Sequence, residues 1–255
     1  MPLHHKHQGQ GAPLVLIHGL FGSLENLGAI ARMLAHDFSV YSLDLPNHGR
    51  SPHVDDTSLP AMSKQVAQWM AQHKLENAHI VGHSLGGKTA MELALTRPAL
   101  VDRLVVMDIA PSTYPPHHSD VFKGLLSVDI DNIRSRSEAE EAMKSHVPEI
   151  AVRSFLLKNI QRESSGRFSW RMNLTALHAH YADLICGNSN KVFDGDTLFL
   201  KGGASDYITE KNRDDIVRRF PKSALKVVVN TGHWLHAEKP EIVSKLIQRF
   251  LLSDR

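Results

Sequence analysis

Six short apolar runs constrain the fold of this 255-residue chain more than any other feature. They are apolar rather than alternating, which is typical of strands that are buried on both faces of a sheet. Amphipathic stretches separate them, and this alternation predicts an α/β fold with a mostly parallel central sheet flanked by helices. The runs cover residues 14–17, 40–43, 79–81, 104–107, 198–200 and 225–229.

Helical periodicity predicts three helices between or after these strands, at residues 58–74, 85–96 and 240–252. Pro60 is tolerated in the first because it lies in the first turn, and Pro98 ends the second because proline disfavours a helical residue before it. The expected core-facing residues are Leu59, Met62, Val66, Trp69, Met70 and His73 in the first helix and Ile242, Leu246 and Phe250 in the last.

The alternation is interrupted between residues 111 and 196, where helical patterns occur with little strand signal. Prolines mark the start of this segment, and a stretch rich in Asn, Asp and Gly marks its end. We therefore expect residues 1–110 and 197–255 to form the α/β core and residues 111–196 to form an inserted helical cap.

A candidate nucleophile lies in Gly82-His83-Ser84-Leu85-Gly86, directly after the strand at 79–81 and at the start of the helix at 85–96. This strand, sharp turn and helix form the context that a nucleophile elbow requires, because glycines let the strand and helix pass closely. A serine hydroxyl needs an adjacent base to become a good nucleophile. We therefore expect Ser84 to be the nucleophile.

The candidate base is His233, which follows the last predicted strand at the edge where open α/β sheets place their sites. A carboxylate must orient the imidazole, and two are available at that edge. Asp108 ends the strand at 104–107, beside the nucleophile strand and shortly before Pro111, whereas Asp206 follows the strand at 198–200. Asp108 is favoured as the acid and Asp206 is the alternative. If Asp206 is not the acid, it is expected to be a loop residue that caps a helix over 208–219.

The loop His18-Gly19-Leu20-Phe21-Gly22 follows the strand at 14–17 and is expected to supply one N–H of an oxyanion hole. Leu20 is the favoured donor and Phe21 the second choice, with Leu85 as the other donor. Phe21, Trp170 and Trp234 are candidate substrate-binding residues, although Trp170, with Phe168 and Tyr181, also fits a role in the core of the cap.

Composition excludes several other functions. Basic and acidic residues nearly balance, 29 to 27, without long charged runs, so no nucleic-acid partner is expected. No zinc-binding or nucleotide-binding motif occurs, so neither a metal nor a cofactor is expected. The longest apolar runs are too short to span a membrane. A single cysteine and an N-terminus without a signal peptide pattern predict a cytoplasmic protein.

Several motifs together resemble the α/β-hydrolase superfamily, and more narrowly the bacterial YbfF esterases, relatives of abhydrolase domain-containing protein 11. The motifs are His18-Gly19, the segment 44–52, the segment 82–88, the segment 108–111 and the segment 232–238. The resemblance implies an α/β-hydrolase fold, carboxylesterase activity on short to medium acyl chains with acyl-CoA thioesters also considered, and an acid at Asp108. It also implies a first hairpin, which must be short or missing here.

The sequence thus predicts a serine esterase or thioesterase that acts on a small acyl ester or thioester through an acyl-enzyme on Ser84. Serine at position 84 argues against epoxide hydrolases and haloalkane dehalogenases, which need a carboxylate nucleophile there. Carbon–carbon bond hydrolases and perhydrolases use the same triad and stay open, as does a non-catalytic receptor on the same fold. The oligomeric state cannot be read from the sequence.

Overall fold

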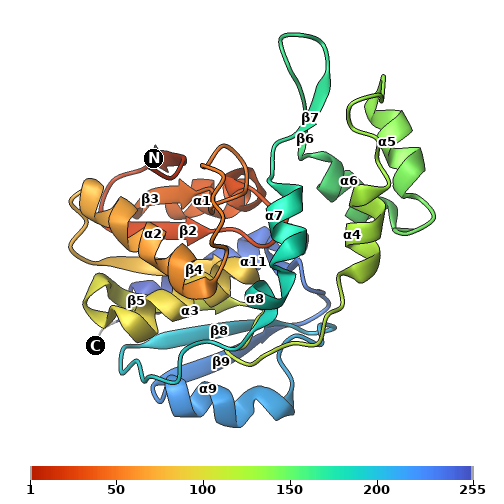
Figure 1. Cartoon of the computed structure of the whole chain (residues 1–255). Coiled ribbons are helices and arrows are strands. Elements are labelled where there is room, and N and C mark those ends of the chain that lie inside the picture. The colour runs from red at the N-terminus through yellow and green to blue at the C-terminus, as the bar shows by residue number, and fades with distance from the viewer. Residues whose placement is uncertain (1, 254–255) are drawn as a thin grey trace.

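A seven-stranded sheet forms the centre of the computed structural model, which describes residues 2–253 (Figure 1). The strand order is β1-β3-β2-β4-β5-β8-β9, and every pair is parallel except β1 with β3. The strands are β1 (His5–Gln8), β2 (Ala12–Ile17), β3 (Phe38–Leu43), β4 (Ala78–His83), β5 (Val101–Met107), β8 (Thr197–Gly202) and β9 (Ser223–Val228). All six predicted runs are strands. The first hairpin was expected to be short or missing; the structure has a short β1 that pairs antiparallel with β3 and not with the next strand, β2.

One strand is less buried than its composition predicts. β9 is apolar, yet it lies at the edge of the sheet, and Leu225 and Val227 are each 50% exposed. A parallel strand is covered on both faces only when helices cross both of its sides. Strand order cannot be read from composition, so the expectation that β9 is a buried strand was wrong.

Helices cover both faces of the sheet (Figure 1). Helices α2 (Leu59–Gln72) and α3 (Leu85–Thr96) pack in one apolar cluster, and α1 (Gly28–Leu34) and α11 (Pro240–Leu251) pack in the other. The shorter helices of the core are η1 (Leu24–Leu27), η2 (Pro98–Leu100), η3 (Glu210–Asn212), α9 (Arg213–Arg219) and α10 (Leu235–Glu238).

The predicted helices have the expected type and nearly the expected bounds. In α2, Ser58 Oγ caps the N-terminus by accepting from the Ala61 N–H at 3.3 Å. In α11 the buried apolar residues are Val243, Ile247 and Leu251, whereas Ile242 is 47% exposed. The predicted Leu246 and Phe250 are partly buried and pack against the same apolar cluster. The centre of the buried face therefore lies one residue, or about 100° around the helix, from the predicted one.

The segment between β5 and β8 consists mainly of helices that lie beside the sheet (Figure 1), and it is called the cap below. Its helices are α4 (Ser119–Leu126), α5 (Arg136–Met143), α6 (Ile150–Leu157), α7 (Leu174–Ala179) and α8 (Tyr181–Ile185). It also contains an unexpected hairpin of β6 (Ile160–Arg162) and β7 (Phe168–Trp170), so the aromatic residues at 168 and 170 lie on a strand and not on a helix. The exact limits of the cap stay a prediction.

Buried neutral histidines lead to a prediction about stability. Burial lowers the pKa of His48 to about 3 and that of His18 to about 4. Each histidine binds a proton more readily when the chain is unfolded, so its contribution is fully present above pH 6.5 and is lost as the pH falls toward the folded pKa. Between pH 7 and pH 5, one such residue lowers the free energy of unfolding by about 2 kcal/mol.

Between pH 7 and pH 5, we expect the free energy of unfolding of the His48→Gln variant to fall by about 2 kcal/mol less than that of the wild type. Urea unfolding followed by tryptophan fluorescence measures this difference. His36→Gln, at an exposed histidine, is the control and should lose as much as the wild type. Equal losses in all three proteins would contradict the interpretation.

Candidate active site

Ser84 lies at the sharp turn between β4 and α3, in a backbone conformation that few residues adopt. Its φ is 53° and its ψ is −119°. The chain can make this turn because glycine stands on both sides: a Cβ at Gly82 would lie 2.3 Å from the Gly86 carbonyl oxygen, and a Cβ at Gly86 would lie 2.3 Å from the Ile17 carbonyl oxygen. The strained conformation is held in part by a 3.0 Å hydrogen bond from the Ser84 N–H to the Met107 carbonyl.

Two backbone segments present free N–H groups beside Ser84. In the loop after β2, the Gly22 N–H donates to the Gly19 carbonyl at 3.0 Å, and Phe21 has a φ of 59°, so residues 19–22 form a tight turn. Among the described residues 2–253, the N–H groups of Leu20, Phe21 and Leu85 make no hydrogen bond. Leu85 begins α3, where the helix dipole favours negative charge. Both segments thus have donors available for an anion.

His18 holds the loop after β2 in place. It is fully buried, its Nε2 accepts from the Leu45 N–H at 3.0 Å, and its Nδ1 therefore carries the proton that is donated to the Gly19 carbonyl at 2.8 Å. Burial lowers the His18 pKa to about 4, which keeps the ring neutral and preserves this pattern of one donor and one acceptor. These two hydrogen bonds of His18 therefore hold the turn in place. The sequence showed His18 as part of a motif but did not indicate this role.

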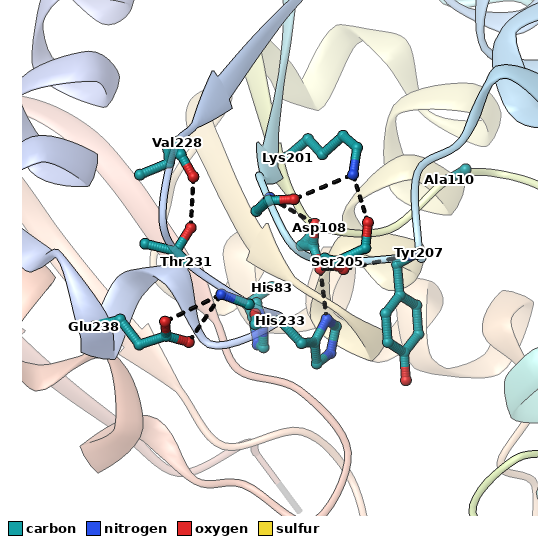
Figure 2. Close-up of polar contacts among 12 residues, drawn as sticks. His83, Asp108, Ala110, Lys201, Ser205, Tyr207, Val228, Thr231, His233 and Glu238 are labelled. Carbon is teal, nitrogen blue, oxygen red and sulfur yellow. Dashed lines mark hydrogen bonds and ion pairs between the residues drawn. The ribbon is translucent and has the colours of Figure 1, made fainter.

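The ring of His233 is hydrogen bonded to Asp108 (Figure 2). Within residues 2–253 it makes no hydrogen bond to Asp206. His233 Nδ1 lies 2.8 Å from Asp108 Oδ2. Asp108 is fully buried, and its carboxylate also accepts from the Gly202 N–H at 2.8 Å and from the Ser205 hydroxyl. Asp206 is exposed. It also does not cap a helix, because Thr209 and Asn212 precede η3 and α9.

Three neighbours hold His233 in place: Tyr207 contacts its ring, and His83 and Glu238 contact its loop. Tyr207 stacks on the ring with ring centroids 3.9 Å apart and an interplanar angle of 19°. His83 Nε2 lies 2.9 Å from the His233 carbonyl oxygen, and the Gly232 N–H donates to the Glu238 carboxylate (Figure 2). The loop that carries His233 is thus held on both sides, which leaves the ring little freedom to rotate away from Asp108.

Two small cavities meet at Ser84. The larger, about 80 Å³, is lined by Ser84 and His233, by Phe21 and Trp234, and by apolar cap residues including Val152 and Phe155. The smaller, about 30 Å³, is lined by Ser84, Leu85 and Lys88 and by residues at both ends of the cap. Of the predicted substrate-binding residues, Phe21 and Trp234 line the larger cavity. Trp170 lies on β7, packs against the main apolar cluster and lines neither cavity.

A family model for the alpha/beta hydrolase fold matches residues 12–240, which is most of the chain. The chain belongs to the α/β hydrolase fold family. Esterase YbfF of Escherichia coli (strain K12) is 36% identical over 247 residues, which cover 96% of this chain and 95% of that protein. The sn-1-specific diacylglycerol lipase ABHD11 of Xenopus laevis is 40% identical over 252 residues, covering 95% and 80% of the two chains.

A solved structure of a marine microorganism esterase superposes on this α/β hydrolase with a TM-score of 0.95, at 36% identity, over 98% of this chain and 99% of that one. These relatives show a hydrolase of the esterase or lipase type. No helix within residues 2–253 is long and apolar enough to cross a membrane.

Sequence reasoning missed two polar residues at the site of this α/β hydrolase. His118, in the segment between β5 and β8, lines both cavities, and among the described residues only Ser84 and Leu20 do the same. Its Nδ1 lies 2.6 Å from the Tyr181 hydroxyl. Burial lowers its pKa to about 3, so the ring is neutral near Ser84. No sequence signal distinguishes it from neighbouring His117, because its position depends on how the cap folds.

Lys88 is the second polar residue that the sequence did not reveal, and it connects the cap to the core. Its side chain is 2% exposed, and Nζ donates to the Ser112 carbonyl at 2.8 Å and to the Cys186 carbonyl at 2.6 Å. These two carbonyls belong to the two chain segments that connect the cap with the sheet. Burial lowers the Lys88 pKa to about 8, so the ammonium is mostly charged at neutral pH, when its donors are strongest.

The close approach at the elbow predicts the effect of a single methyl group. Gly82→Ala should lower the free energy of unfolding by about 3 kcal/mol, because a Cβ 2.3 Å from the Gly86 carbonyl forces β4 and α3 apart. Gly28→Ala is the matched control: its φ is −61° and its nearest contact is the flexible end of Arg32 at 3.7 Å, so it should stabilise the protein by about 0.5 kcal/mol. Urea unfolding of both variants measures this; a Gly82→Ala protein as stable as the wild type would contradict the strained turn.

Proposed function

We propose that this α/β hydrolase is a carboxylic ester hydrolase that acts on small acyl esters through Ser84, His233 and Asp108. One observation carries the proposal: Ser84 and His233 line the same cavity, and the far nitrogen of the His233 ring is bound to a fully buried carboxylate. This is the order of groups by which a serine hydroxyl is activated. The names of the relatives, an esterase and a diacylglycerol lipase, support the same class of substrate.

In the first half of the reaction, Ser84 Oγ attacks the acyl carbonyl while His233 Nε2 takes the hydroxyl proton. Asp108 accepts the Nδ1–H bond and stabilises the imidazolium that forms. The N–H groups of Leu85 and Leu20 stabilise the carbonyl oxygen as it becomes negative, with Phe21 as the alternative to Leu20. The bond to the leaving group then breaks, and His233 gives its proton to the departing alcohol.

In the second half, water attacks the acyl group on Ser84. His233 takes a proton from the water, a second tetrahedral intermediate forms and collapses, and the proton returns to Ser84 Oγ. The products are one carboxylic acid and one alcohol, and the enzyme is unchanged. A thioester reacts in the same way and releases a thiol.

The dimensions of the site support small acyl groups. The cavities at Ser84 measure about 80 Å³ and about 30 Å³, and apolar side chains from the cap form much of their walls. An apolar wall favours a hydrocarbon chain, and each buried methylene contributes about 0.8 kcal/mol. Phe21 and Trp234 are the residues proposed to contact the substrate there, whereas the position of Trp170 gives no support for such a role.

Covalent labelling tests the nucleophile. Treatment with a fluorophosphonate, followed by digestion and mass spectrometry, should place the label on Ser84 and on no other serine, because only an activated hydroxyl reacts rapidly. The same protein should turn over p-nitrophenyl butyrate continuously, whereas a receptor would release at most one equivalent of nitrophenol. A label elsewhere, or none, would refute the proposal.

A pair of matched variants tests the acid. Asp108→Asn should lower kcat on p-nitrophenyl butyrate by about 10⁴-fold, because an amide no longer favours the imidazole tautomer that can accept the Ser84 proton. Asp206→Asn should keep kcat within about twofold, since exposed surface substitutions have small effects. Circular dichroism checks that both variants are folded. The opposite order of activities would assign the acid to Asp206.

A further inference from the structure

A third, larger cavity lies on the same edge of the sheet, beside the cavity of about 80 Å³ at Ser84, which is called the Ser84 cavity below. Its volume is about 460 Å³. The start of β1, the loop after β3, the turn before α1 and one residue of the cap form its walls. The loop after β3 leaves the carboxyl end of its strand, as do the segments that carry Ser84 and Asp108, so both cavities open at the edge where α/β sheets bind ligands.

Four basic side chains from four separate segments line this cavity. They are Lys6 of β1, Arg32 of α1, Arg50 of the loop after β3 and Arg171, which follows β7 of the cap. Within residues 2–253, none of the four makes an ion pair or a side-chain hydrogen bond. The buried arginines Arg153 and Arg219 are hydrogen bonded. Arg134 and Arg249 also make no side-chain hydrogen bond or ion pair within the described residues, so what distinguishes the four is that they line one cavity together.

Two carboxylates also line the cavity, but they do not balance these charges. Asp44 is 2% exposed, and its two oxygens accept from the Leu24 N–H at 2.7 Å and the Arg50 N–H at 2.8 Å. Glu25 is exposed and makes no ion pair among the described residues. Four cations therefore face two carboxylates, one of them already satisfied by backbone donors, and the cavity attracts anions.

The two cavities share one turn of the chain. Gly22 and Asn26 line the Ser84 cavity, and the three residues between them, Ser23, Leu24 and Glu25, line the basic cavity. The two cavities are therefore neighbours, and this turn separates them. The turn is held firmly, because the Ser23 N–H donates to Asn26 Oδ1 at 2.6 Å and the Leu24 N–H donates to Asp44.

We infer that the basic cavity binds the phosphate-bearing part of a substrate whose acyl group is hydrolysed at Ser84. Guanidinium groups suit this role because one guanidinium can donate two parallel hydrogen bonds to two oxygens of a phosphate. The inference rests on the proposed function insofar as the ligand is a substrate. The phosphate remains unreacted: the acyl group moves to Ser84 Oγ, and the leaving oxygen or sulfur takes a proton from His233. The leaving group is either a thiol with a phosphorylated tail, as in coenzyme A, or a phosphoglycerol.

Paired substrates test this inference. Butyryl-coenzyme A is compared with S-butyryl-N-acetylcysteamine, and dibutyryl phosphatidate with dibutyrylglycerol, so each pair differs by its phosphates. The measured quantity is the ratio of kcat/KM for the charged member to that for the neutral member. In the triple variant Arg32→Gln, Arg50→Gln, Arg171→Gln, we expect this ratio to fall at least about tenfold for one pair, which identifies the leaving group.

The control removes the same charge at the opposite edge of the sheet. Lys211→Gln, Lys222→Gln, Lys226→Gln changes three exposed lysines on and near β9 and should leave both ratios unchanged. Added salt should lower the wild-type ratio toward that of the arginine variant, because ions screen exposed charges. Ratios that are equal in the wild type and the arginine variant for both pairs would overturn the inference.

Failure of the proposed function would give a different result, namely no turnover of either neutral substrate by the wild type. The site is then tested by calorimetry with coenzyme A and with glycerol 3-phosphate. Binding to the wild type that the arginine variant lacks would support the anion site without hydrolysis. No binding of either compound to the wild type would overturn it.

Discussion

The close approach of β4 and α3 is the constraint on which the site depends. Gly82 and Gly86 touch each other at distances that no side chain permits, and Gly86 also lies against the backbone that ends β2. One crossing therefore sets three things together: the φ of 53° at Ser84, the start of α3 at Leu85 and the position of the turn at residues 19–22. The hydroxyl and the free N–H groups beside it keep a fixed relation because the same backbone contact positions both.

Buried polar groups, and not apolar packing, fix the loops around this crossing. His18 holds the turn after β2 through one donor and one acceptor, and Asp108 holds the loops after β8 and β9 through Gly202, Ser205 and His233. Such groups are costly to bury unless every partner is present. Displacement of one loop leaves a buried donor or acceptor without its partner, so the loops are stable only in this arrangement.

The sequence predicted the features that depend on local pattern. The six runs are strands, and the positions of Ser84 and His233 followed from the strand before each of them. The choice between Asp108 and Asp206 needed the tertiary structure, because both residues follow strands that end at the same edge. Only the fold shows that Asp108 meets the His233 ring and that Asp206 faces solvent.

The errors have related physical causes. The exposure of β9 depends on strand order, and the hairpin at residues 160–170 consists of two three-residue strands, which are too short for periodicity to distinguish from a helix. The position of His118 at the junction of two cavities depends on the docking of the cap. In each case the deciding contact joins residues far apart in the chain, which no local window contains.

Asp44 connects the two cavities at the carboxyl edge of the sheet. Its buried carboxylate accepts from the N–H of Leu24, in the turn that separates the cavities, and from the N–H of Arg50, which faces the basic one. The same group therefore holds the turn between the two cavities and the backbone of one of the unpaired arginines. Lys88 has an equivalent role on the other side of Ser84, where its ammonium group donates hydrogen bonds to both chain segments that connect the cap with the sheet. The segments on both sides of Ser84 are thus held in place by buried charged groups, which fixes the arrangement that a substrate at Ser84 meets.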